Sequence, residues 1–184
     1  MNFIDDTKKY IIELEEVLTP DECTGLIEKI ESLNPSLATI NTASGTKVNT
    51  NVRNNERVIF DDVELAQKLY DDVAEFLPQE FGERKICGAN ERFRCYRYKP
   101  GMRFAPHRDG AFVRNESEMS HYSFLVYLND DFKGGETTFF TRPEVVIQPV
   151  LGNALLFQHP LMHEGSIVKS GVKYVLRSDI MYAK

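Results

Sequence analysis

Two side chains that can bind a metal flank a single residue in the tripeptide His107-Arg108-Asp109. On extended backbone, residues two apart point to the same face, so this imidazole and carboxylate can act together. A second imidazole, His163, follows a run that is typical of a strand and precedes another strand. Two histidines and one carboxylate on one face are the ligand set that leaves coordination positions open on non-heme Fe(II).

Three histidines, at positions 121, 159 and 163, are candidates for the second imidazole ligand. His159 precedes Pro160, which favours extended or turn backbone and suits a buried, hydrogen-bonded histidine. His121 stands at the start of an expected strand, where a structural role or one near the substrate is the simpler interpretation. Of the three, His163 is the one that stands ten residues before Lys173, whose ammonium offers a cation to an acidic co-substrate. This spacing favours His163.

These residues need a scaffold, and the pattern after residue 90 predicts one built of strands. Arg92–Tyr98 alternates in polarity, and Tyr122–Leu128 is an apolar run typical of a strand that is covered on both faces. Further strands are expected over residues 104–109, 137–141, 145–148, 154–157 and 172–182. The sequence therefore predicts a mainly β protein, a sandwich or open barrel backed by helices.

Two amphipathic helices are expected before residue 88, with short strands over residues 10–18 and 58–60. Thr19, Pro20 and Glu22 are a helix start signal, with a cap, a first-turn proline and a capping box. The two apolar stripes are Cys23, Leu26, Ile27, Ile30 and Leu33, then Leu65, Leu69, Val73, Phe76 and Leu77. The polar stretch Asn41–Glu56 is expected to be a loop, either solvated or acting as a lid over substrate.

The expected strand over residues 172–182 carries Lys173, Val175, Arg177 and Asp179 on one face. That face can lie in water, or it can line the inside of a barrel. Inside a barrel, unpaired cations are costly, so an anionic ligand would have to compensate Lys173 and Arg177.

Composition limits the classes of protein. The 184 residues are expected to form one domain, 1–184, with helical support over about 1–87 and a catalytic core over about 88–184. A net charge of -6 argues against a broad nucleic-acid-binding surface. The three cysteines suggest no disulfide framework. No signal peptide and no membrane span are expected, so we predict a cytoplasmic protein.

Five ordered motifs lie between residues 90 and 182: Tyr98-Lys99-Pro100-Gly101, His107-Arg108-Asp109, Tyr127-Leu128-Asn129, Gly134-Gly135-Glu136-Thr137 and His163 with Lys173. In this order and spacing they resemble the Fe(II)- and 2-oxoglutarate-dependent dioxygenases, and most closely the prolyl 4-hydroxylase-like branch. The resemblance implies a double-stranded β-helix, or jelly roll, with the metal at its mouth. The stretch Asn41–Arg57 matches no known substrate-binding loop of that family.

The resemblance also implies roles for single residues. His107, Asp109 and His163 match the iron ligands, and Lys173 matches the basic residue that binds the distal carboxylate of 2-oxoglutarate. Three more residues match positions near the co-substrate: Tyr98, Tyr127 and Arg177. Arg177 is implied to contact either co-substrate or substrate.

The implied reaction consumes 2-oxoglutarate and O2, releases succinate and CO2, and hydroxylates an unactivated carbon of a prolyl or other amino-acid side chain. Ascorbate is expected to stimulate it. The substrate, a small molecule or a protein side chain, stays unidentified. Two other readings are oxidative demethylation of nucleic acid, which the acidic charge disfavours, and a non-catalytic metal-binding jelly roll. Lys173 and Tyr127 argue against the second, because a bare metal site has no need of a dicarboxylate pocket.

Overall fold

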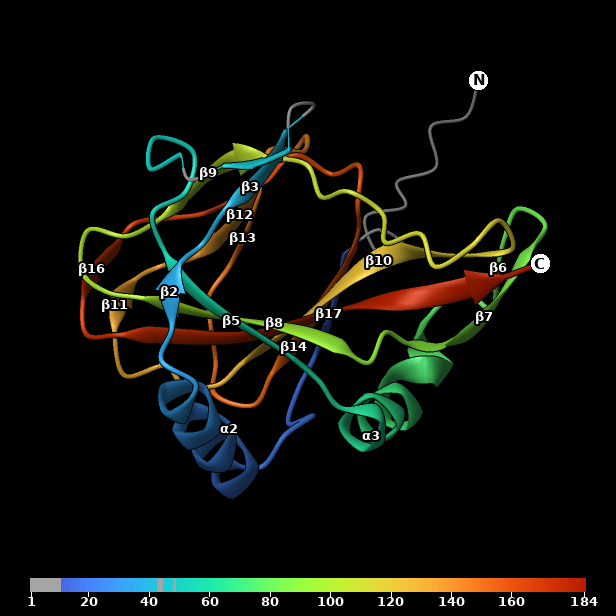
Figure 1. Ribbon diagram of the computed structural model, residues 1–184, viewed down its shortest axis with the longest axis horizontal. Coiled ribbons are helices and arrows are strands. Elements are labelled where there is room, and N and C mark those ends of the chain that lie inside the picture. The colour runs from blue at the N-terminus through green and yellow to red at the C-terminus, as the bar shows by residue number, and fades with distance from the viewer. Residues whose placement is uncertain (1–10, 43–44, 48) are drawn as a thin grey trace.

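The computed structural model describes residues 11–42, 45–47 and 49–184, and two antiparallel sheets make up its body (Figure 1). The larger sheet has the order β1 (Ile11–Leu14), β14 (Ala154–Gln158), β10 (Glu118–Tyr127), β17 (Lys173–Ala183), β8 (Arg92–Tyr98), β5 (Glu56–Asp61) and β2 (Ser36–Leu37). At its side, β7 (Arg84–Ala89) pairs with β17 and with β6 (Glu80–Phe81).

The smaller sheet has the order β13 (Val145–Ile147), β12 (Thr137–Phe139), β15 (His163–Gly165) and β9 (Phe104–His107). Two strand pairs complete the fold: β11 (Lys133–Gly134) with β16 (Val168–Ser170), and β3 (Ile40–Thr42) with β4 (Gly45–Lys47). The arrangement confirms the predicted jelly roll.

Two helices, α2 (Pro20–Ser32) and α3 (Val63–Val73), lie on the side of the larger sheet away from the smaller one (Figure 1). One core cluster joins α2 and α3 to the larger sheet through residues such as Ile30, Leu69 and Phe93. A second cluster fills the space between the two sheets, with Leu125 from one and Phe139 from the other. The helices therefore close the back of the barrel.

The helix signals were confirmed at the level of single bonds. The Glu22 backbone N–H donates to Thr19 Oγ1 at 3.3 Å, and the Thr19 N–H donates to Glu22 Oε2 at 2.9 Å, so the capping box is formed. The stripe predictions were wrong at Leu33 and Phe76, which are 46% and 52% exposed. Leu33 lies past the end of α2. Phe76 lies in the 3₁₀ turn η1 (Ala74–Phe76), whose tighter winding rotates it off the buried face.

The strand predictions were correct where the alternation of side chains continued over many residues. β8 coincides with the predicted Arg92–Tyr98, whereas β9 ends at His107, so Asp109 lies beyond the strand. The stretch expected as a loop contains β4, which pairs with β3, and the start of β5, so its prediction as a simple loop was wrong. Residues 43, 44 and 48 of that stretch, and Tyr10 of the first expected strand, lie outside the described residues. None of the helices in the described part of the chain has the length and apolar character of a membrane span.

Candidate metal and co-substrate site

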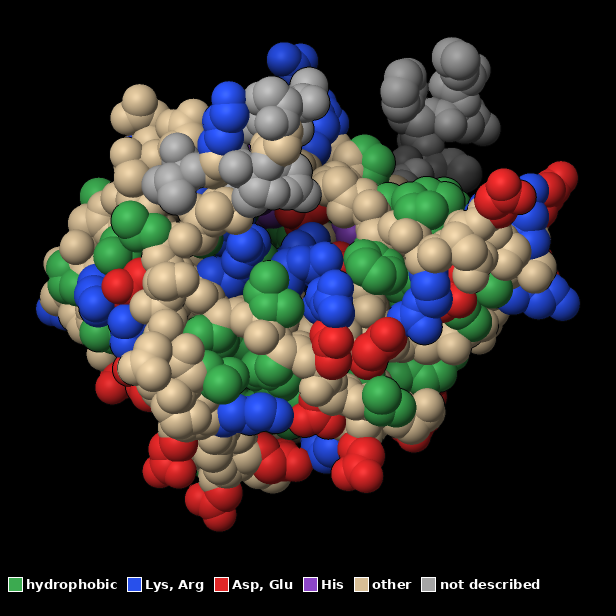
Figure 2. Space-filling model, viewed as in Figure 1, with side chains coloured by type: hydrophobic (Ala, Val, Ile, Leu, Met, Phe, Trp, Pro, Cys, Tyr) green, Lys and Arg blue, Asp and Glu red, His purple; other side chains and the backbone are tan. Residues whose placement is uncertain are grey.

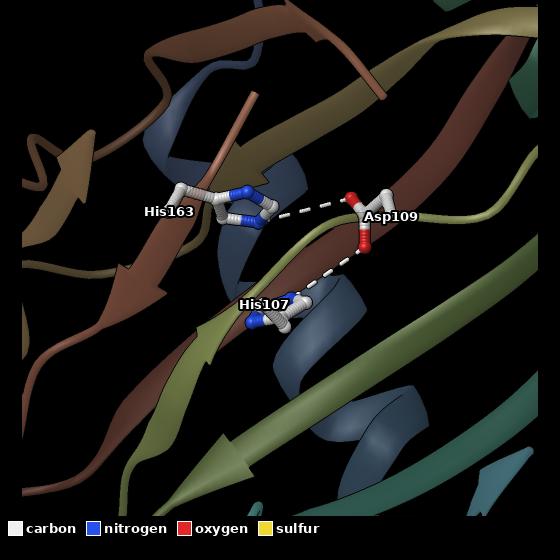
Figure 3. A group of neighbouring side chains, drawn as sticks. All are labelled: His107, Asp109 and His163. Atoms are coloured by element: carbon white, nitrogen blue, oxygen red, sulfur yellow. Dashed lines mark ion pairs between the residues drawn. The ribbon is translucent and has the colours of Figure 1, made fainter. Parts of the chain in front are cut away.

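Pairing between β9 and β15 places His107 directly opposite His163. Asp109 follows two residues after β9 and turns its carboxylate toward both imidazoles (Figure 3). Asp109 Oδ1 lies 3.5 Å from His107 Nε2, and Asp109 Oδ2 lies 3.8 Å from His163 Nε2. One donor atom from each residue lies within 4.8 Å of the others, which is the spacing of side chains that can hold a single metal ion.

The backbone orients both imidazoles for ligation. His107 Nδ1 is 2.8 Å from the carbonyl oxygen of Ala105, and His163 Nδ1 is 2.9 Å from that of Leu161. A carbonyl only accepts, so Nδ1 carries the proton in each ring and Nε2 keeps its lone pair. Bonds of this kind to the second ring nitrogen usually accompany histidine ligands.

The pKa shifts of Asp109 and His163 favour binding of a cation. Burial opposes ionisation of Asp109, but the positive charge of Arg177, together with smaller contributions from the neighbouring His107 and His163 side chains, outweighs it and holds the pKa of Asp109 well below its usual range. Burial lowers the pKa of His163 to about 4, although Asp109 opposes the shift. The carboxylate is therefore charged and His163 is neutral near pH 7, and these are the protonation states in which they bind metals.

Asp109 is held by a chain of hydrogen bonds that begins at Ser120 and passes through His159 and Ser123. Ser123 Oγ lies 2.5 Å from Asp109 Oδ2 and 3.0 Å from His159 Nδ1. The ionised carboxylate can only accept, so the hydroxyl donates to it and takes a bond from His159 Nδ1–H. His159 Nε2 then accepts from Ser120 Oγ at 2.8 Å. His159 is thus the buried, hydrogen-bonded histidine that the sequence allowed. It lies outside the set of His107, Asp109 and His163, which we call the metal group.

Arg177 connects Asp109 to a second buried carboxylate. Its guanidinium nitrogen Nη2 lies 3.2 Å from Asp109 Oδ2 and 3.2 Å from Asp179 Oδ1. Burial acts against the charge of Arg177, but the two carboxylates outweigh it and raise its pKa well above the usual value. Arg177 therefore balances the charge of Asp109.

A narrow cavity of about 40 Å³ runs from the metal group to Lys173. Lys173 Nζ lies 5.5 Å from the centroid of the Tyr98 ring and 5.2 Å from that of Tyr127, and it donates to the Gly135 carbonyl at 2.5 Å. Lys173 pairs with Tyr98 in the register of β17 and β8. Of the four residues expected around the co-substrate, Lys173, Tyr98 and Arg177 line this cavity.

Tyr127 approaches this cavity indirectly. Its hydroxyl lies 2.8 Å from Thr137 Oγ1, and Thr137, not Tyr127, lines the cavity.

Burial lowers the pKa of Lys173 to about 7, against the opposing charge of Glu136. Since a buried lysine without an anionic partner shifts in this direction, the site suits a ligand that brings negative charge.

His121 lies apart from the metal group. It stacks on Phe81 with 4.1 Å between ring centroids and meets Tyr182 edge-on at 5.3 Å. The structural interpretation of His121 fits this place.

Sequence reasoning missed Ser123, Thr137 and Arg53 as residues at or beside the site. Ser123 is the only residue without an apolar side chain or ring in the run of β10 from Tyr122 to Val126, and a lone small polar residue in such a run is a signal for an internal partner. Thr137 is the last residue of the motif Gly134-Gly135-Glu136-Thr137, for which the resemblance implied no role. Arg53 lies in a polar stretch, and no local pattern indicates its burial.

Comparison with known proteins agrees with this geometry. Residues 93–178 match the family model described as the 2OG-Fe(II) oxygenase superfamily, a range that contains the metal group, Lys173 and Arg177. No curated protein gave a significant match to the sequence.

Solved structures with the same fold include three prolyl hydroxylases. The viral collagen prolyl hydroxylase of Paramecium bursaria Chlorella virus-1, in complex with 2-oxoglutarate, is 25% identical with a TM-score of 0.67, over 96% of this chain and 97% of that one. A Pseudomonas putida prolyl-4-hydroxylase is 16% identical with a TM-score of 0.72, over 96% and 95%. The prolyl hydroxylase of Trichoplax adhaerens, in complex with a peptide fragment of hypoxia inducible factor, is 17% identical with a TM-score of 0.69, over 94% and 83%.

Fold, donor set and family match agree on an Fe(II)- and 2-oxoglutarate-dependent dioxygenase: residues 93–178 match the 2OG-Fe(II) oxygenase superfamily, and the chain has the fold of the prolyl hydroxylases.

Proposed function

We propose that His107, Asp109 and His163 hold Fe(II), and that the enzyme uses 2-oxoglutarate and O2 to hydroxylate a prolyl side chain. The observation that supports the residue assignment is the narrow cavity that starts at three metal-type donors and ends at a buried ammonium. A dicarboxylate needs both ends of such a cavity, a metal for one carboxylate and a cation for the other.

When bound, the iron supplies the oxidising chemistry that couples decarboxylation of 2-oxoglutarate to C–H hydroxylation. The residues of the chain bind and orient. Lys173 would pair with the distal carboxylate of 2-oxoglutarate, and Tyr98 would line its binding pocket. Tyr127 would support Thr137, whose hydroxyl can turn between the tyrosine and the ligand. Arg177 and Ser123 would hold Asp109 in place while substrate and O2 exchange.

The proposal of a prolyl substrate rests on the fold and the family. A viral relative with 25% identity is described as a collagen prolyl hydroxylase, and another structural neighbour was solved with a peptide fragment bound. Beside the metal group this chain has an outer cleft of about 580 Å³, wide enough for a peptide side chain together with its flanking residues.

The test is aerobic incubation with Fe(II), ascorbate, 2-oxoglutarate and proline-containing peptides, with succinate assayed and the peptides weighed by mass spectrometry. We expect succinate and a product about 16 mass units heavier, from the addition of one oxygen atom. Asp109→Ala is the matched control, and it should abolish both signals even if some metal stays bound. Succinate without a hydroxylated peptide would contradict the prolyl substrate but not the reaction class. Neither signal in the metal-loaded wild type would contradict the reaction class as well.

We further propose that residues 1–184 form one catalytic domain that acts in the cytoplasm. β1, β2 and β5, from the first third of the chain, lie in the same sheet as β17 and support one domain. The three free cysteines, of which Cys23 and Cys95 are buried, fit a reducing compartment. Limited proteolysis would contradict the single domain if it released a folded fragment near residue 87. Fractionation of the producing cell would test the compartment.

A further inference from the structure

The outer cleft differs in charge from the rest of the protein. On the face shown in Figure 2, Lys and Arg side chains gather around a hollow, with histidine and acidic atoms visible at its floor, while acidic side chains occupy the lower edge over the helices. The cleft is lined by His107 and Asp109 and therefore opens onto the metal group. The chain as a whole has a net charge of -6, so the basic cleft is a local feature.

Five arginines line this cleft against two aspartates. Both aspartates already have partners: Asp179 Oδ2 lies 3.0 Å from Arg94 Nη1, and Arg177 bridges Asp109 and Asp179. The other three arginines, Arg53, Arg57 and Arg108, have no carboxylate partner among the described residues. Arg57 donates to Thr39 Oγ1 at 3.0 Å, and Arg108 donates to the Pro160 carbonyl.

Arg53 is 5% exposed and is held between two rings, with Cζ 4.1 Å from the Phe104 centroid and 4.8 Å from the Tyr96 centroid. Its Nε donates to Asn55 Oδ1 at 3.0 Å, but its Nη2 has no hydrogen-bond partner in the structure. A buried, charged donor without a partner is costly. This guanidinium lies beside the metal group, and a buried, charged donor without a partner at such a place is typical of a ligand-binding site.

The arginines also repel one another. Burial lowers the pKa of Arg57, and the charges of Arg53, Arg94 and Arg177 lower it further, with Tyr96 opposing. Because like charges gathered in a partly buried cleft destabilise the protein, an anion that entered the cleft would relieve both the repulsion and the missing contacts.

We infer that the substrate of this enzyme carries a carboxylate, and that Arg53 and Arg57, which have no carboxylate partner in the described part of the chain, form the wall that binds it. This rests on the proposed function and narrows the substrate to a peptide with an acidic residue next to the hydroxylated proline. A planar guanidinium matches a carboxylate with two parallel hydrogen bonds. The phosphates of a nucleic acid would also match, but the acidic remainder of the surface would repel a long polyanion.

The experiment uses three capped peptides that differ at one position beside the proline, where they carry Glu, Gln or Lys. Binding is measured by calorimetry without O2, on protein loaded with Fe(II) and 2-oxoglutarate, and hydroxylation is measured separately by mass spectrometry. We expect the Glu peptide to bind about tenfold more tightly than the Gln peptide, and the Lys peptide to bind most weakly. The preference should shrink as salt is raised.

Variants test the wall directly. Arg57→Gln should reduce the preference for Glu over Gln to about threefold or less, and Arg57→Glu should turn it toward the Lys peptide. Arg92→Gln is the matched control, because Arg92 lies on the same strand as Arg94 but pairs with Asp61 and does not line the cleft. It should leave the preference unchanged.

Equal binding of the three peptides, or a preference that survives both Arg57 variants, would overturn the inference. So would tighter binding of a single-stranded oligodeoxynucleotide than of the Glu peptide. A Glu preference in binding, lost in Arg57→Gln, without hydroxylation of any peptide would support the acidic-substrate inference and contradict the prolyl reaction. Equal binding and equal hydroxylation of all three peptides would do the reverse.

Discussion

Ser123 donates a hydrogen bond from its hydroxyl to Oδ2 of Asp109, with 2.5 Å between the two oxygens. Ser123 belongs to β10 in the larger sheet, whereas Asp109 follows β9 in the smaller one. The bond therefore fixes the carboxylate of the metal group relative to the opposite sheet. It also makes the position of Asp109 depend on His159, which holds the other side of the same hydroxyl.

Replacing this hydroxyl should weaken metal binding. Ser123→Ala removes one bond to Asp109 and leaves His159 Nδ1–H without its partner, so we expect Fe(II) affinity to fall about ten- to a hundredfold. Titration of Fe(II) into apoprotein without O2 measures the change. Ser123→Thr keeps a hydroxyl and should recover most of the affinity, and Ser170→Ala, at an exposed site, should have no effect. Equal affinity in wild type and Ser123→Ala would show that the bond has no part in ligation.

Removing the Lys173 ammonium from the narrow cavity should weaken binding of 2-oxoglutarate. Lys173→Ala is expected to raise the 2-oxoglutarate concentration needed for half-maximal turnover by about ten- to a hundredfold, because a charged pair is lost. Fe(II) binding should stay nearly constant. Lys169→Ala, an exposed lysine on β16, is the control. An unchanged 2-oxoglutarate requirement in Lys173→Ala would assign the distal carboxylate to another cation.

Arg177 should behave differently from Lys173, because it serves two buried carboxylates. Arg177→Ala leaves Asp109 and Asp179 without that cation, and we expect the free energy of unfolding to fall by about 3 kcal/mol or more. Urea denaturation measures it. A stable Arg177→Ala protein with only a raised 2-oxoglutarate requirement would mean that Arg177 binds co-substrate directly.

The pKa of Lys173 predicts a pH dependence of stability in the absence of co-substrate. Burial lowers this pKa to about 7 in the folded protein, from 10.5. Between these values the unfolded chain holds more protons, so the free energy of unfolding should rise with pH above 7, by about 1–3 kcal/mol over two pH units. Lys173→Met should lack this contribution. Parallel pH profiles for wild type and Lys173→Met in urea denaturation would contradict the prediction.

Gly152 should be far less tolerant of a side chain than Gly82. Both have positive φ, +79° and +62°, so alanine is strained at either position. A Cβ on Gly152 would also overlap the carbonyl oxygen of Leu18, whereas a Cβ on Gly82 would meet open space. We expect Gly82→Ala to cost about 1 kcal/mol of stability and Gly152→Ala at least 2 kcal/mol more. Equal losses in urea denaturation would contradict this.

Much of the scaffold could be predicted from local chemistry. The capping box of α2 depends on Thr19 and Glu22 alone, and β8 depends on an alternation seven residues long, so neither needs the rest of the fold. Short strands such as β15 and β16 have three residues each, too few to show a period. Their pairing is decided by the strands beside them.

The same division holds at the site. The spacing of His107, Asp109 and His163 is visible in the chain, and the structure brings these three together. The burial of Arg53 is not visible, because it depends on the rings of Tyr96 and Phe104 from two other strands. The sequence therefore left the polar stretch around Arg53 open between a solvated loop and a lid, and it could not predict that the charge of Arg53 is buried.

The central position of β17 has a consequence for how the protein is made. β17 lies between β10 and β8, and it carries both Lys173 and Arg177. Until residues 173–183 are available, no strand joins β10 to β8, so the larger sheet cannot be completed from its earlier segments. Pairings between such distant segments form slowly. The complete site should therefore arise only after β17 has been translated, because a nascent chain stalled before it lacks both the Lys173 ammonium and the arginine that balances Asp109.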